Sequence, residues 1–318
     1  MPETEISMLG WALLLHNVFV GLQDVAVDAL AVDQLEGGDR ERASGMMYCS
    51  AYVGTFLGGA GLGIVTARLG LSTVIAAMTA AQAAILAVVL AVRERAAASG
   101  DEALATGHAA PAPLAMIRTL VRAMVKPLAL RAAVAAFLLK VLPAALSVVM
   151  LVQLVERFGW SQERYSTVTG GAGVLLGLVA AVAAGFLAGR FGPRPTAIVA
   201  SLALGVAWIA FGLAARGWES TAVVFGYVAA DTVCMAAMSV ALFSIFMRVA
   251  SPAVAATQFT ASMAIMNLAT IVGSWLAGPI GDLVDPPTAF LIAGCIQPLL
   301  SLLVPAGRER GPSGSPIA

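Results

Sequence analysis

The chain has 318 residues, of which 60% are hydrophobic and only 11% are charged, and its formal net charge is zero. Soluble domains carry about 25% charged residues, so this composition excludes a soluble globular protein and favours a lipid environment. A neutral chain shows no basic footprint for nucleic acid, and its three widely spaced cysteines predict neither a disulfide framework nor a metal site.

Nine apolar segments follow one another along the chain, and about 20 helical residues cross the roughly 30 Å hydrocarbon layer of a bilayer. They run over 7–35, 45–67, 71–92, 128–156, 165–189, 195–215, 220–248, 254–280 and 287–305. We therefore predict an all-α polytopic membrane protein with about nine transmembrane helices. The predicted parts are three helices in 1–92, a cytoplasmic linker in 93–127, six helices in 128–306 and a disordered tail in 307–318.

The first segment carries polar and ionisable residues where a spanning helix normally has none. They are His16, Asn17, Gln23, Asp24 and Asp28. A charge near the middle of a bilayer costs about 2.5–3.5 kcal/mol on insertion scales, so such residues usually face a cavity or a solute path. Asn17, Asp24 and Asp28 share one helix face, because they are seven and four residues apart. Alternatively, these groups hydrogen-bond to neighbouring helices.

The linker contains an amphipathic pattern near its end. Its apolar positions lie on one face, at Leu114, Ile117, Val121, Met124 and Val125. Basic residues recur on another face, at Arg118, Arg122 and Lys126. This pattern predicts a helix in the membrane interface, although a solvated basic face would give the same spacing.

Lys140 lies near the middle of the fourth segment, from where its side chain cannot easily reach the membrane surface. Pro143 follows within one turn and frees a backbone carbonyl. A central lysine can bind an anionic group of a solute. It can instead form a structural pair with a carboxylate such as Asp24 or Asp231.

Polar residues recur in the seventh and eighth segments, at Asp231, Gln258 and Asn267. The two amides can bond to solute or to neighbouring helices. A carboxylate in a dehydrated cavity can exchange a proton near neutral pH. Asp24, Asp28 and Asp231 are therefore candidate proton carriers.

The loop charges predict an orientation. Thirteen Lys and Arg residues fall on the loop side that contains Arg40 and Arg42, against four on the other side. Positive loops face the cytoplasm, so we expect the linker and the C-terminus there, in the cytoplasmic (inner) membrane.

Small residues recur at G-x-x-x-G spacing, for example in Gly54/Gly58, Gly173/Gly177 and Gly185/Gly189, and predict close helix packing. The pattern of Gly185–Gly192, with Gly185, Gly189, Arg190 and Gly192, also parallels Gly63–Gly70. Internal repeats of this kind are typical of transporters.

The run Leu22–Ala29, followed by Asp33 and Arg40–Arg42, resembles helix 4 of AmpG-type muropeptide permeases. These permeases and the related acetyl-CoA transporters belong to the major facilitator superfamily. Further similarities follow in chain order, at Leu139–Val141, Gly185–Gly192, Asp231–Cys234 and Ala256–Phe259. The resemblance covers nearly all of residues 9–305.

This resemblance implies a helical bundle of the major facilitator type, in which the nine segments match family helices 4–12. Helices 1–3 would then be supplied by a segment upstream of Met1. It implies a proton-coupled secondary transporter that moves a polar anionic solute, such as a muropeptide, by alternating access and uses no cofactor. The chain has fewer charged residues at these positions than the family, for example at Gly170–Gly171. The solute can therefore differ from that of the family.

Two other functions are compatible with a membrane protein of this composition. An intramembrane enzyme is disfavoured, because the sequence contains neither H-E-x-x-H nor G-x-S-x-G. A truncated, non-transporting remnant or a partner subunit of a split transporter is the alternative that the expected absence of three helices favours.

Overall fold

The computed structural model describes residues 3–34, 39–61, 68–91, 113–161, 164–165, 167–251 and 254–306. Linker residues 93–112 and the expected tail, 307–318, lie outside these ranges. Every regular element in the described part is helical, which confirms the predicted all-α class.

The first group of helices comprises α1 (Glu3–Gln34), α2 (Asp39–Thr55), α4 (Leu71–Ala91) and α6 (Pro113–Met124). The second comprises α7 (Pro127–Val152), α9 (Gly173–Phe191), α10 (Pro193–Leu213), α11 (Thr221–Val249), α12 (Ala255–Leu283) and α13 (Pro286–Ser301). Helix α2 continues into a π-helical turn, Phe56–Gly61. Two more π-helical turns, Gln153–Arg157 and Thr167–Ala172, lie at the end of α7 and the start of α9.

Seven helical stretches in the described ranges are long and apolar enough to cross a bilayer. Two of them are parts of α1 and α4, and the other five include α7, α9, α10, α11 and α12. The predicted number was nine. Helices α2 and α13 have only 17 and 16 residues. Helix α2 also begins earlier than expected, because Asp39 and Glu41 in its first turn suit the positive end of the helix dipole.

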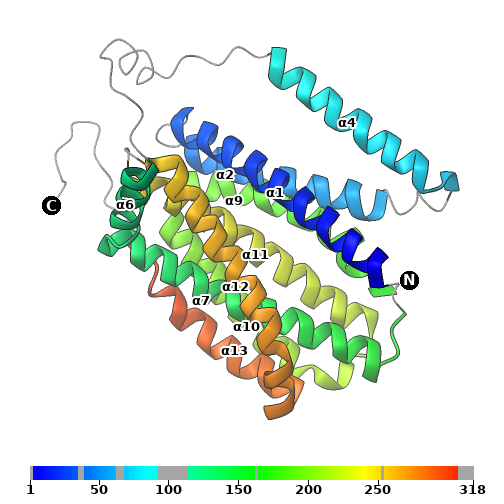
Figure 1. Cartoon of the computed structure of the whole chain (residues 1–318). Coiled ribbons are helices and arrows are strands. Elements are labelled where there is room, and N and C mark those ends of the chain that lie inside the picture. Colours follow the sequence, from blue (N-terminus) through cyan, green and yellow to red (C-terminus); the bar gives the residue numbers. More distant parts are fainter. Residues whose placement is uncertain are drawn as a thin grey trace, which may run out of the picture.

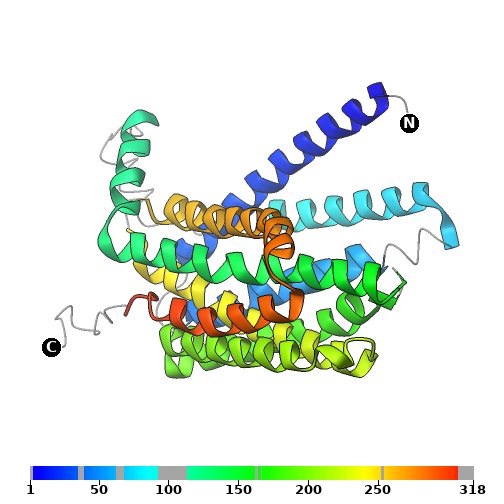
Figure 2. The same cartoon turned by 90° about the horizontal axis from the view of Figure 1, so that it is seen from below.

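The six helices from α7 to α13 form a bundle with roughly aligned axes (Figures 1 and 2). Helix α7 packs against α12 and α13, and α10 packs against α11 and α13. Helix α2 lies on this bundle against α9 and α11, whereas α1 follows α12 and α4 stands apart in Figure 1. The core of the described part therefore lies mainly within the six-helix bundle.

Glycines allow the closest helix crossings. A Cβ added at Gly205 of α10 would lie 2.8 Å from the ring of Pro298 on α13, and one added at Gly294 of α13 would lie 2.7 Å from the Gly205 carbonyl. A Cβ at Gly273 of α12 would lie 2.8 Å from Ala144 of α7. Small residues thus set the distance between helices here, as they do in other membrane bundles.

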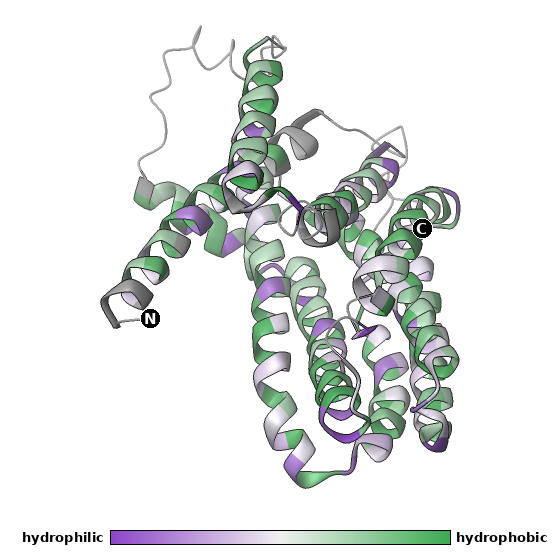
Figure 3. Cartoon of the chain, turned by 90° about the vertical axis from the view of Figure 1, so that its right-hand side faces the viewer, coloured by the Kyte–Doolittle hydropathy of each residue, from purple (hydrophilic) through white to green (hydrophobic). Residues whose placement is uncertain are grey.

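Many large apolar side chains of the described part are exposed. Figure 3 shows green, hydrophobic residues along much of the helix length and purple, hydrophilic residues at several helix ends. Exposed apolar side chains include Trp11, Leu90 and Val179. In a bilayer these side chains would contact acyl chains, so their exposure needs no protein partner.

Asp285 fixes the start of α13 outside the spanning stretches. Its carboxylate accepts a hydrogen bond from the Thr288 amide at 3.2 Å, which makes it the helix N-cap. The hydrogen bond from Thr288 holds the pKa of Asp285 below its usual value.

Candidate functional site

Lys140 of α7 is held by a neutral group. Its Nζ donates to the Ser239 hydroxyl of α11 at 2.9 Å. The ion pairs within the described ranges are Arg42–Asp39 and Arg248–Glu41, so no carboxylate neutralises the ammonium directly. Since Lys140 is only partly buried, it keeps the capacity to donate further hydrogen bonds to an anion.

Pro143 leaves a gap in the backbone bonding next to this lysine. Proline has no N–H, so the carbonyl of Leu139, four residues earlier, loses its normal helix partner. The amide Nε2 of Gln297 on α13 donates to that carbonyl at 3.1 Å. Gln297 and Leu139 are fully buried, so this bond replaces the missing one in the turn that positions Lys140.

Asp231 of α11 is bound by two aromatic donors. Trp208 Nε1 of α10 donates to Oδ1 at 2.9 Å, and the Tyr227 hydroxyl, one turn earlier on α11, bonds to the same carboxylate. Trp208 is fully buried, whereas Asp231 is partly exposed. The carboxylate is therefore oriented by two donors from two neighbouring helices.

The two charged groups are separated along one helix face. Asp231 and Ser239 are eight residues apart on α11, which is about 12 Å or slightly more than two turns. Lys140 sits at the Ser239 level and still acts electrostatically on Asp231. Opposite charges thus lie at two levels of the bundle instead of forming a closed pair.

Helix α2 brings two tyrosines to this region. Tyr48 and Tyr52 contact each other edge to face, with ring centroids 5.5 Å apart, and Tyr48 meets Phe243 of α11 at 5.4 Å. The ring of Tyr52 fills the space above Gly177 of α9, and it lies within electrostatic range of Asp231. A helix from before the linker therefore reaches the same face of α11.

The polar residues of α1, in contrast to Lys140 and Asp231, are exposed wherever their side chains are described. His16, Asn17, Gln23 and Asp24 are exposed, and the side chain of Asp28 lies outside what the structure describes. In the described part, no hydrogen bond or ion pair joins Asp24 to Lys140 or Asp231. Their place in a solute or proton path stays a prediction.

The two amides of α12 also differ from each other. Gln258 is 2% exposed, and its Oε1 accepts a hydrogen bond from the Ser251 amide at 2.8 Å, at the start of α12. This contact is structural, because it fixes the connection from α11 to α12. Asn267 is exposed midway along α12. Solute contact by either residue stays a prediction.

Two glycines of the glycine-rich motif have structural roles, one in helix packing and one in backbone conformation. A Cβ at Gly185 would lie 2.9 Å from the Glu41 carbonyl and 3.1 Å from Gly45 of α2, so α2 and α9 meet there in close contact. Gly192 has φ +92° between α9 and α10, a conformation that favours glycine. Gly189 and Arg190 are exposed, and the Arg190 guanidinium lies 5.6 Å from the ring centre of Phe191.

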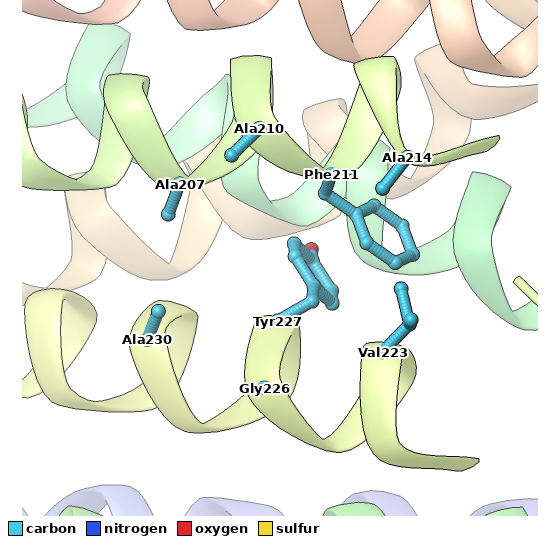
Figure 4. A pocket seen from close by; sticks show the side chains of 8 residues that line it. All are labelled: Ala207, Ala210, Phe211, Ala214, Val223, Gly226, Tyr227 and Ala230. Carbon is cyan, nitrogen blue, oxygen red and sulfur yellow. The ribbon is translucent and has the colours of Figure 1, made fainter. Parts of the chain in front are cut away.

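A cavity of about 250 Å³ opens between α10 and α11, and its lining is apolar except for Tyr227. Figure 4 shows the rings of Phe211 and Tyr227 meeting there, with Ala207 and Ala230 farther along the two helices. Lys140 and Asp231 are not among its lining residues. Tyr227 therefore lines this apolar pocket and also bonds through its hydroxyl to Asp231.

Sequence reasoning missed five partners in this region: Ser239, Trp208, Tyr227, Tyr52 and Gln297. Serine, tryptophan and tyrosine are common in spanning helices, and only the packing of α2, α7, α10 and α11 reveals their roles. Gln297 did carry a signal, because an amide in an apolar segment needs a partner.

A family model described as Major Facilitator Superfamily matches residues 4–274. A search of curated proteins found no match.

Proposed function

Because the chain belongs to the major facilitator superfamily, a superfamily of membrane transporters, we propose that it is a proton-coupled secondary transporter of a polar, anionic solute. Within that superfamily we propose the AmpG type, with a muropeptide or a similar metabolite as the solute. The solute would move by alternating access, as two groups of helices rock about a central site.

The observation that carries this proposal is the unneutralised ammonium of Lys140. Among the described residues, the Ser239 hydroxyl is the partner of the Lys140 ammonium, and neither ion pair of these residues includes it. A lysine held in this way, and partly exposed within a spanning bundle, is poised to take an anionic group in place of a protein carboxylate. In a structural Lys–Asp pair, the protein carboxylate would instead neutralise the ammonium.

Asp231 is the proposed proton carrier of the same site. Trp208 and Tyr227 orient its carboxylate by hydrogen bonds, and a carboxylate in a dehydrated site can exchange a proton near neutral pH. Asp24 and Asp28 of α1 are further proposed carriers, and His16, Asn17, Gln23, Gln258 and Asn267 complete the proposed path. We also propose that the end of the bundle with α6 faces the cytoplasm, together with the C-terminus.

The test is solute-driven proton movement into proteoliposomes that contain a pH-sensitive dye. A disaccharide-peptide with free carboxylates, added outside, should acidify the lumen. Lys140→Ala should abolish the signal, and Asp231→Asn should abolish proton movement while leaving solute exchange. Ser239→Ala should raise the solute concentration needed, because it removes only the positioning hydroxyl.

The matched control is Lys126→Ala, which removes the only other lysine of the sequence from the end of the bundle. Its transport should equal that of the unaltered chain. Unchanged transport by both Lys140→Ala and Asp231→Asn would overturn the assignment of the site. No flux with any anionic sugar or peptide, but flux with a cationic solute, would overturn the assignment of the solute class.

A further inference from the structure

Helix α6 lies across the end of the bundle and not along it. Figure 2 shows α6, coloured teal, crossing the direction of α7 at the end where α7 and α12 begin. Spanning helices run roughly along the membrane normal, so a helix that crosses them at their ends lies close to the membrane plane.

Three faces of α6 have different surroundings. Ala123 is 3% exposed, and Leu120 and Met124 are partly buried, so this face contacts the bundle. An apolar stripe next to it is exposed, with Leu114 at 78%, Ile117 at 58% and Val121 at 54%. The stripe continues past the helix through Val125 to Leu128 at the start of α7, which belongs to a spanning stretch.

The basic side chains flank this stripe on the side away from the bundle. Arg118 and Arg122 are exposed one turn apart, and neither takes part in an ion pair within the described ranges. Lys126 follows, and its Nζ bonds to Ser251 at 2.9 Å, in the connection between α11 and α12. The sequence has no acidic residue between Glu102 and Glu156, so no nearby carboxylate of this segment competes for these cations.

We propose that α6 is a binding surface for anionic phospholipid in the adjacent leaflet. The guanidinium groups of Arg118 and Arg122 bind the phosphate of the headgroup, and Leu114, Ile117 and Val121 lie among the upper acyl chains. Two features favour a lipid over a soluble anion. The apolar stripe borders the cations directly, and it is continuous with a spanning helix that must itself be covered by lipid.

The experiment uses the full chain in detergent and counts bound lipids by native mass spectrometry. Phosphatidylglycerol and phosphatidylcholine with identical acyl chains are titrated separately. We expect phosphatidylglycerol to bind more tightly, and Arg118→Gln with Arg122→Gln to lower its apparent affinity by about tenfold or more, as expected for two cations at an anionic surface. Arg118→Lys with Arg122→Lys should keep most of the affinity.

The matched control is Arg157→Gln with Arg216→Gln, which removes two exposed arginines from the opposite end of the bundle. It should leave phosphatidylglycerol binding unchanged. A thermal melt in phosphatidylcholine checks folding, and the Gln pair in α6 should melt like the unaltered chain because both side chains are exposed.

Three outcomes would overturn the proposal. Equal binding of the two lipids would show that charge is not recognised. Competition by inorganic phosphate at concentrations comparable with the lipid would show a simple cation patch. A change in oligomer mass in the α6 variant, without any effect of phosphatidylglycerol, would assign this face to a second copy of the chain.

Discussion

Gln297 illustrates how one side chain can replace a missing backbone hydrogen bond next to Lys140. Pro143 removes the N–H that would bond to the Leu139 carbonyl, and Gln297 of α13 supplies the replacement at 3.1 Å. A buried carbonyl without a partner costs about 1–3 kcal/mol. The turn from Leu139 to Pro143, which contains Lys140, therefore lacks one helical hydrogen bond without that penalty, at the point where α7 contacts α13.

The first prediction is that Gln297→Leu destabilises the protein by about 1–2 kcal/mol, because the Leu139 carbonyl is then buried without a donor. The same substitution in a Pro143→Ala background should cost less than half as much, because alanine restores the N–H four residues after Leu139. Denaturant titration of the four proteins, followed by circular dichroism, measures this coupling.

Equal costs in the two backgrounds would show that Gln297 stabilises the bundle only by packing. Ser301→Ala on α13 is a suitable control, because its hydroxyl bonds within its own helix to the Pro298 carbonyl. Its effect should be the same with proline or alanine at position 143.

Charged residues in apolar segments are the candidates that the sequence identifies most directly, although their roles stay predictions. Lys140 and Asp231 stand out in apolar segments, because their cost in lipid demands an explanation. Their partners could not be predicted, because a serine such as Ser239 or a tryptophan such as Trp208 can lie in a spanning helix without the cost of a buried charge. Finding them requires knowing that α11 lies beside α7 and α10, which a single sequence does not specify.

At the scale of elements, the crossing of α2 and α9 depends on two glycines. A Cβ at Gly45 would lie 2.8 Å from the Ala181 carbonyl, and a Cβ at Gly185 would lie 2.9 Å from the Glu41 carbonyl. Both obstacles are backbone atoms, so they cannot move without moving a helix. The crossing can form only where both helices lack side chains.

The second prediction compares two glycines of α2. Gly45→Ala should destabilise the protein by about 1–3 kcal/mol, because the helices must separate to admit the methyl group. Gly54→Ala adds the same methyl group at a position with no atom within 4 Å, so it should be neutral or stabilising. Thermal unfolding of the two variants in the same detergent provides the measurement.

A loss of stability in Gly54→Ala equal to that in Gly45→Ala would contradict this account of the crossing. The sequence predicted small-residue packing at Gly185 and at Gly54 alike, since both have G-x-x-x-G spacing. Only Gly185 meets a neighbouring backbone. Spacing identifies a face that allows close approach, but the position of the partner helix decides whether approach occurs.

The helices themselves could be predicted from hydropathy, because about 20 apolar residues in succession leave few alternatives in a bilayer. The start of α2 was predicted six residues too late. Its first turns are polar, Asp39 to Arg42, and looked like a loop. Glu41 is nevertheless fully buried, because a basic partner from a distant helix reaches it.

At the scale of the whole molecule, that partner joins the two parts of the chain on either side of the linker. Arg248, in the last turn of α11, donates from Nη2 and Nε to Glu41 Oε1 of α2 at 2.6 and 2.7 Å. Glu41 is 0% exposed and Arg248 is 30% exposed. The pair lies beside the crossing of Gly45 and Gly185, so charge and close packing hold α2 on the bundle at one place.

The third prediction is that Arg248→Gln destabilises the protein by about 3 kcal/mol, the low end for a broken buried pair, because Arg248 is partly solvated. The double variant with Glu41→Gln should cost less than the single one, since no buried charge is then left unpaired. Unfolding in denaturant measures the coupling between the two positions.

The same pair should control access between α2 and the bundle. If α2 separates from α9 and α11 when this end of the protein opens, then Glu41→Gln with Arg248→Gln should speed the reaction of Cys49 with a maleimide, because Cys49 is half-buried beside that contact. The control pair is Arg42–Asp39, whose side chains are 64% and 70% exposed and 3.7 Å apart. Removing an exposed pair costs at most about 1 kcal/mol, so Arg42→Gln with Asp39→Asn should leave the Cys49 rate unchanged. Equal acceleration by both double variants would mean that loss of surface charge, and not release of α2, governs the reaction.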